Sequence, residues 1–127
     1  MKREIIATTD APAAIGPYSQ AVRTGAMVFC SGQIPLDPVT GDLVGEDIES
    51  QTRRVLDNLR AVVEAAGASL DRVVRTTIYL VDLGDFARVN EIYGSYFGEP
   101  HPSRATIGVA ALPKGSRIEI DAIAVVD

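Results

Sequence analysis

The chain of 127 residues is poor in the side chains on which metal and nucleophilic chemistry usually depends. It has one cysteine (Cys30), one histidine (His101) and no tryptophan. One thiol cannot form an internal disulfide, and one cysteine with one histidine cannot supply a zinc cluster. His101 stands between two prolines, which indicates a rigid surface loop and disfavours a Ser-His triad. We therefore expect neither a metal nor a cofactor.

Basic charge is also scarce. Twelve lysines and arginines face 17 acidic residues, the net charge is −5, and Lys2 and Lys114 are the only lysines. This balance argues against broad binding to nucleic acid or to anionic membranes. No apolar run approaches the ~20 residues that span a bilayer, and the apolar N-terminal stretch is too short for a secretory signal. We expect a cytoplasmic protein with neither kind of partner.

The length predicts a single domain over residues 1–127, and the hydrophobic content of 46% is ordinary for a folded chain. Glycine and proline punctuation with hydrophobic periodicity predicts the order β-β-α-β-α-β-β. Asp47 and Gly67 suit the start and stop of the clearest helix. The predicted strands are 18–24, 26–32, 71–81, 103–109 and 116–126, the helices are 48–66 and 82–97, and a further strand is possible at 3–7.

Two amphipathic helices and one sheet predict an α+β sandwich with one open sheet face. In the last strand one side is purely apolar and suits the face under the helices; the other mixes Glu119 and Asp121 with Ile123 and Val125. We interpret this mixed face as a subunit interface. The alternative is a partly apolar solvent face.

Two charged residues could carry chemistry. Arg104 follows two prolines at a strand start, where a guanidinium can grip a small carboxylate with two hydrogen bonds. Glu119 lies on the mixed face, where burial would raise its pKa toward the range useful for proton transfer. The simpler interpretation is that both residues pair with other charges, such as Arg75 or Arg117.

Several segments together resemble one family. They are Ile15-Gly16-Pro17-Tyr18-Ser19-Gln20-Ala21, Ser31-Gly32-Gln33-Ile34, Val89-Asn90-Glu91-Ile92-Tyr93, Pro102-Ser103-Arg104-Ala105-Thr106-Ile107, Ala110-Ala111-Leu112-Pro113-Lys114-Gly115 and Ile118-Glu119-Ile120-Asp121-Ala122-Ile123-Ala124. In this order they resemble the RidA/YjgF/UK114 family, the reactive-intermediate deaminases. The resemblance covers essentially the whole chain.

The resemblance implies a chorismate-mutase-like fold whose open sheet face is buried in a homotrimer, with a ligand cleft at each subunit interface. It also implies a hydrolase that acts on C=N bonds. Members of the RidA subgroup convert 2-imino acids such as 2-iminobutanoate and 2-iminopropanoate, and the tautomeric enamines such as 2-aminoacrylate, to 2-oxo acids and ammonia. Pyridoxal-phosphate enzymes release these intermediates.

By the same resemblance, Arg104 matches the arginine that binds the substrate carboxylate, and Glu119 matches the acid that activates water. Tyr18, Ser31, Gly32 and Asn90 match positions that line the cleft. Thr106 stands where many members have cysteine, which could alter substrate preference. Cys30 is expected to be a small buried hydrophobe.

Other functions remain open for this chain. The same cleft could bind or sense 2-oxo acids or related metabolites without catalysis, with Arg104 as anchor. Family members have also been described as ribonucleases or translation inhibitors. The acidic charge balance disfavours binding or cleavage of nucleic acid by this chain.

Overall fold

The computed structural model describes residues 2–126, which form one six-stranded sheet and two α-helices. Short 3-10 turns at Leu70–Arg72, Leu83–Asp85 and Pro113–Gly115 precede β4, α2 and β6. Between residues 2 and 126, no helix has both the length and the apolar character to cross a bilayer. The elements are β1 (Glu4–Ile6), β2 (Ala21–Thr24), β3 (Met27–Gln33), α1 (Ile48–Ala65), β4 (Val73–Leu80), α2 (Phe86–Tyr96), β5 (Ser103–Gly108) and β6 (Ile118–Val125).

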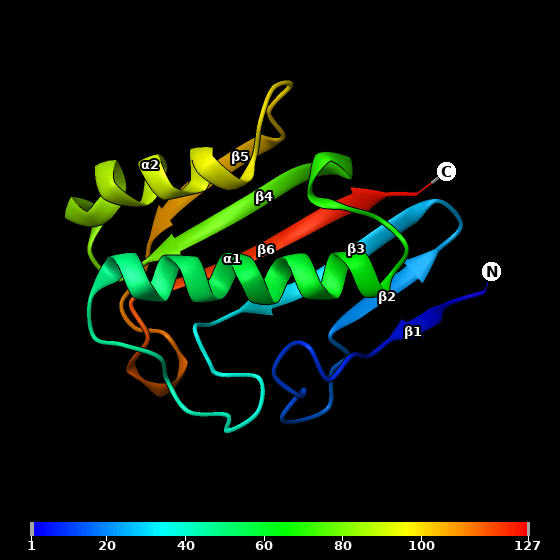
Figure 1. Cartoon of the computed structure of the whole chain (residues 1–127), viewed down its shortest axis with the longest axis horizontal. Coiled ribbons are helices and arrows are strands. Elements are labelled where there is room, and N and C mark those ends of the chain that lie inside the picture. The colour runs from blue at the N-terminus through cyan, green and yellow to red at the C-terminus, as the bar shows by residue number, and fades with distance from the viewer. Residues whose placement is uncertain (1, 127) are drawn as a thin grey trace.

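The strands lie in the order β1-β2-β3-β6-β4-β5, and β6, the last strand in sequence, pairs between β3 and β4. Among the strands of residues 2–126, only the pair β4–β5 is parallel, which makes the sheet mixed. Parallel neighbours need a crossover connection, and α2 supplies it. Figure 1 shows both helices on one face of the sheet, with α1 across its middle and α2 beside β4 and β5.

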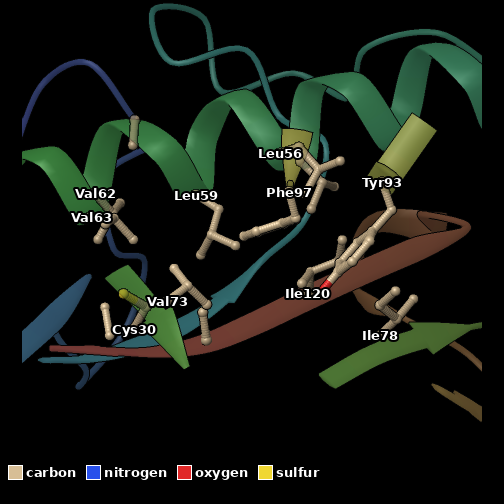
Figure 2. Close-up of a cluster of buried hydrophobic side chains, with 14 of the residues drawn as sticks. Cys30, Leu56, Leu59, Val62, Val63, Val73, Ile78, Tyr93, Phe97 and Ile120 are labelled. Atoms are coloured by element: carbon tan, nitrogen blue, oxygen red, sulfur yellow. The ribbon is translucent and has the colours of Figure 1, made fainter. Parts of the chain in front are cut away.

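The long helix α1 is held by both of its predicted end signals. The Asp47 carboxylate accepts a hydrogen bond from the Ser50 N–H at 2.8 Å, which satisfies one free donor of the first turn. Gly67, with φ 89°, follows the last turn in the left-handed conformation that glycine tolerates. Figure 2 shows Leu56 and Leu59 of α1 pointing into the core above the sheet.

The last strand confirms the predicted division of faces. In β6 the buried positions, which lie under the helices, alternate with half-buried positions on the open face. The α+β sandwich with two helices on one face is therefore confirmed. The buried set is Ile118, Ile120, Ala122 and Ala124, and the half-buried set is Glu119, Asp121, Ile123 and Val125.

Some predicted details were wrong. Strict alternation along the predicted strand 71–81 places Val73 on the same face as Arg75, but the β4–β6 register shifts between these two residues and Val73 is buried. The predicted helix 82–97 begins with a 3-10 turn over Leu83–Asp85, and the α-helical part starts only at Phe86. The strand predicted from Tyr18 begins at Ala21, because the segment before it packs as an irregular loop.

Candidate functional site

Glu119 projects from the open face near the middle of the sheet. It lies opposite Tyr79 of β4 and is half-buried. Burial raises the pKa of Glu119, and the negative charge of Asp121, two residues along the same face, raises it further. A raised pKa brings the carboxyl group closer to the range that is useful for proton transfer near neutral pH.

A bulge in β3 brings backbone against this carboxyl group. The β3–β6 register shifts between Cys30 and Gln33, so Ser31 and Gly32 form an irregularity beside β6. A Cβ atom on Gly32 would overlap the Glu119 carboxylate and lie only 2.8 Å from its Cδ. Glycine at this position therefore lets the Glu119 carboxylate lie against the backbone.

The same region encloses a cavity of about 430 Å³. Glu119, Ser31, Gly32 and Tyr18 all line it, so four of the predicted site residues lie together. The Ser31 hydroxyl donates to the Ser19 carbonyl at 2.6 Å, and the Ser31 N–H donates to the Gln20 carbonyl at 3.0 Å. These bonds tie the bulge to the segment that carries Tyr18.

Arg104 lies on the other face of the sheet. Its register partner in β4 is Thr76, which is fully buried under the helices. The Arg104 Cζ atom is 4.9 Å from the ring centroid of Tyr93 and 5.6 Å from that of Phe86, both on α2. The guanidinium is therefore held over two aromatic rings by cation–π contacts, which leaves its N–H groups able to bind a carboxylate.

Asn90 and Thr106 accompany Arg104. Asn90 of α2 lines a hollow of about 360 Å³ together with Arg104 and Tyr93. Thr106 follows Arg104 by two residues on β5 and pairs with the buried Ile78, so its side chain lies on the same face of the sheet as Arg104. These residues form a second group on the helix-covered side of the edge strand.

A single chain thus divides the predicted site residues into two groups on opposite faces. Arg104 and Glu119 are two strands apart, and their partners on β4 are Thr76 and Tyr79. Strand spacing and rise place their Cα atoms roughly 14 Å apart. One chain does not bring Arg104 and Glu119 to a common substrate.

The simpler interpretation of these charges, that they pair with neighbours, finds no support in residues 2–126. Arg117 binds the Asp85 carboxylate at 2.9 Å and the Glu46 carbonyl at 3.2 Å. Across the same part of the chain, the side chains of Arg104 and Glu119 take part in no ion pair. Both groups therefore remain available to a ligand.

Cys30 has the structural character predicted for it. It is buried beneath the helices, and Figure 2 shows it in the core with Val73 and Val63. Burial, followed by the charge of Asp121, raises the pKa of the Cys30 thiol to about 12. The thiol is thus protonated at physiological pH and is a poor nucleophile.

Two further residues of the site were not assigned from the sequence. Tyr93 was given no role in the site, yet its ring supports Arg104, and its hydroxyl lies 2.7 Å from the Thr76 hydroxyl. Lys114 lines the Glu119 cavity and donates to the Gly41 carbonyl at 3.1 Å. The spacing of Tyr93 three residues after Asn90, on one helix face, was the available signal for the first.

The family model described as Endoribonuclease L-PSP matches residues 8–126 of this sequence. The chain belongs to this family. It is the group named above from the sequence motifs, RidA/YjgF/UK114, and the fold of the L-PSP family is the one observed here.

Two curated members of the L-PSP family illustrate the range of names among the relatives. Protein DfrA of Myxococcus xanthus is 58% identical over 98% of this chain and 97% of its own length. The 2-iminobutanoate/2-iminopropanoate deaminase of Mus musculus is 51% identical over 97% of this chain and 91% of its own length. Full-length similarity to a named deaminase supports a deaminase role at the level of the family.

A solved family structure adds a bound ligand. Escherichia coli TdcF, crystallised with bound serine, superposes with a TM-score of 0.93 and is 46% identical, with 98% of this chain and 99% of that chain covered.

Proposed function

We propose that this protein is a hydrolytic deaminase that converts 2-imino acids and their enamine tautomers to 2-oxo acids and ammonia. The observation that carries the proposal is that two charged side chains have no ion-pair partner in the part of the chain that the structure describes. One is the Glu119 carboxyl group, which lies against Gly32 and has a raised pKa. The other is the Arg104 guanidinium, which lies over two aromatic rings. A carboxylate anchor and an acid–base group are the two functions that imine hydrolysis needs.

The separation of these groups in one chain supports a site shared between subunits. Arg104 stands at the edge strand, whereas Glu119 lies on the open face. That open face also carries partly exposed apolar residues, including Phe29 and Ile123, which suit an interface. In the proposed homotrimer, Arg104 of one subunit and Glu119 of the next face the same cleft.

The proposed reaction begins with the protonated imine, whose carbon is electrophilic. Arg104 binds the carboxylate with two hydrogen bonds and fixes the imine carbon in front of Glu119. Glu119 takes a proton from water while the water oxygen forms a bond to that carbon. The electron pair of the C=N bond moves to nitrogen, which gives a tetrahedral carbinolamine.

Glu119 then returns the proton to the amine nitrogen. The C–N bond breaks, and the hydroxyl oxygen forms the C=O bond and releases its proton to the carboxylate. Glu119 passes this proton to the departing ammonia, so that ammonium and the 2-oxo acid leave and the carboxylate is restored. One water is consumed and no electrons are exchanged with a cofactor. Acid–base help of this kind typically accelerates a reaction roughly 10²–10⁴-fold.

The test is a coupled assay. A threonine dehydratase supplies 2-iminobutanoate, and the formation of 2-oxobutanoate is followed with and without the protein. Arg104→Ala should abolish the acceleration. Arg53→Ala, which removes an exposed arginine on α1, is the matched control and should leave the rate unchanged.

The outcomes separate an enzyme from a binding protein. Acceleration that disappears only in Arg104→Ala supports the deaminase. If a folded, oligomeric sample gives no acceleration but binds 2-oxobutanoate through Arg104, the protein is a binder of 2-oxo acids, and the proposed function is wrong.

A further inference from the structure

The segment between β1 and β2 forms an apolar wall of the Glu119 cavity. Pro12, Ala13 and Ile15 line the cavity from this segment, together with the ring of Tyr18. None of these four carries a charge, and Ile15 and Tyr18 are 69% and 52% exposed in a single chain. A wall of this composition suits the aliphatic part of a substrate better than its carboxylate.

The segment that carries this wall has no regular secondary structure, and the side chain of Gln20 holds its backbone in place. Gln20 is 4% exposed, and its carboxamide makes four hydrogen bonds to the backbone of the segment. Oε1 accepts from the Thr8 N–H at 2.7 Å, and Nε2 donates to the carbonyls of Thr8, Ala11 and Pro12 at 3.1, 3.4 and 2.7 Å. Buried peptide groups that sheet pairing does not satisfy are thus satisfied by Gln20.

Gln20 also connects the wall to the catalytic side of the cavity. Its carbonyl accepts from the Ser31 N–H at 3.0 Å, and Ser31 precedes Gly32, against which Glu119 rests. The Tyr18 hydroxyl accepts from the Ile15 N–H at 3.3 Å, which closes the tip of the segment on itself. Short, direct contacts therefore fix the position of the wall relative to the Glu119 carboxyl group.

We propose that Gln20 is a positioning residue that fixes the segment 8–15, which carries the apolar wall of the Glu119 cavity, and that this wall favours 2-imino acids with larger aliphatic side chains. The inference rests on the proposed function for the identity of the substrate. Gln20 touches the wall rather than the reacting atoms, so it acts on the distal part of the substrate. Hydrolysis of a small substrate that does not reach the wall should not change when the wall is disturbed.

The experiment compares two substrates. A D-amino-acid oxidase generates 2-iminopropanoate from D-alanine and 2-imino-4-methylpentanoate from D-leucine, because the imine carbon is not a stereocentre. Formation of each 2-oxo acid is measured with the native protein, Gln20→Met and Ile15→Ala. Methionine keeps the volume of Gln20 and removes its hydrogen bonds, whereas Ile15→Ala shortens the exposed tip of the wall and leaves the buried core intact.

The expected result is a change in the ratio of kcat/KM between the two substrates. A missing aliphatic contact costs roughly 10-fold or more, so both variants should lose about that factor on the leucine-derived imine. On the alanine-derived imine they should stay within about twofold, since that substrate does not reach the wall. Ile5→Ala is the matched control, because Ile5 is 60% exposed and does not line the cavity.

Equal losses on both substrates, or no loss on either, would overturn the proposal. If Gln20→Met does not fold, Ile15→Ala decides alone. If the native protein accelerates neither hydrolysis, the proposed function fails, and titration with pyruvate and 4-methyl-2-oxopentanoate tests the wall by itself. In that case an unchanged ratio of the two dissociation constants in Ile15→Ala would overturn it.

Discussion

Glu119 is a carboxyl group whose surroundings raise its pKa above the ordinary carboxyl value. Burial and the nearby Asp121 charge both raise the pKa of Glu119. The Tyr79 hydroxyl donates to Asp121 at 2.8 Å and so holds that second carboxylate in place. The same environment that suits proton transfer therefore makes the ionised residue a cost to the folded state.

This cost predicts a pH-dependent stability effect. Because the pKa of Glu119 is raised on folding, the protonated side chain contributes to the stability of the folded state. This contribution is fully present below the ordinary carboxyl pKa and is lost as the pH rises through the raised pKa. Glu119→Gln should therefore raise the Tm at pH 7 and have little effect below about pH 4. Thermal unfolding across this range is the measurement, with the exposed Glu64→Gln as control. A native protein more stable than Glu119→Gln at pH 7 would contradict the account.

Gly32 provides a second residue-level prediction. In Gly32→Ala the new methyl group occupies the place of the Glu119 carboxylate, and the flexible glutamate rather than the backbone has to move. Imine hydrolysis should fall about 10–100-fold, because a displacement of about 1 Å can cost this much. Circular dichroism and Tm should stay close to native. Gly98→Ala serves as control, since no atom lies within 4 Å of a Cβ built there.

The sequence was sufficient to identify Arg104 and Glu119 as candidates, but not to relate them in space. Residue type and family motifs indicate the two groups without any three-dimensional information. Their placement on opposite faces follows from the parallel pairing of β5 with β4, which puts Arg104 beside Thr76. Strand order and register are long-range properties, and hydrophobic periodicity within one strand does not contain them.

At the scale of elements, α2 does more than cover the sheet. Its Tyr93 packs in the core, as Figure 2 shows, and its ring also supports the Arg104 guanidinium from β5. The crossover that makes the β4–β5 pair parallel thus also supports the residue that we propose as the anchor for the substrate carboxylate.

Two substitutions of Tyr93 separate these roles. Tyr93→Phe removes the hydrogen bond to Thr76 and should destabilise the protein by about 1–2 kcal/mol, because the buried Thr76 hydroxyl loses its partner. It should leave KM nearly unchanged, since the ring remains. Tyr93→Leu removes the ring and should raise KM several-fold beyond that of Tyr93→Phe. Denaturant unfolding and steady-state kinetics are the measurements. Equal KM values in the two variants would argue against the support of Arg104 by the Tyr93 ring.

Regular elements were predicted well and irregular ones poorly. The limits of α1 follow from Asp47 and Gly67, which are local signals. The β4 bulge next to Val73 and the loop held by Gln20 depend on partners distant in sequence. Hydrogen bonds of one buried side chain to several backbone groups leave no periodic pattern in the sequence, so the fixing of the wall by Gln20 could not have been predicted.

In the whole molecule, the proposed function makes Glu119 and Arg104 two halves of one site, which a single chain leaves apart. The Glu119 half opens on one face of the sheet, and the Arg104 half lies across the edge strand on the other. A closed ring of identical subunits repeats one contact and joins unlike halves at every interface. The proposed trimer therefore explains why neither Glu119 nor Arg104 has an ion-pair partner within the described residues of its own chain.

Hybrid oligomers test whether the site is shared between subunits. Arg104→Ala and Glu119→Gln subunits, each inactive alone, are unfolded, mixed in equal amounts and reassembled. In any closed ring with sites between neighbours, an interface that joins an intact Arg104 to an intact Glu119 arises at about one in four positions. The account predicts recovery of about a quarter of the native imine-hydrolysis rate. No recovery in a mixture shown to contain hybrid oligomers would contradict the shared site.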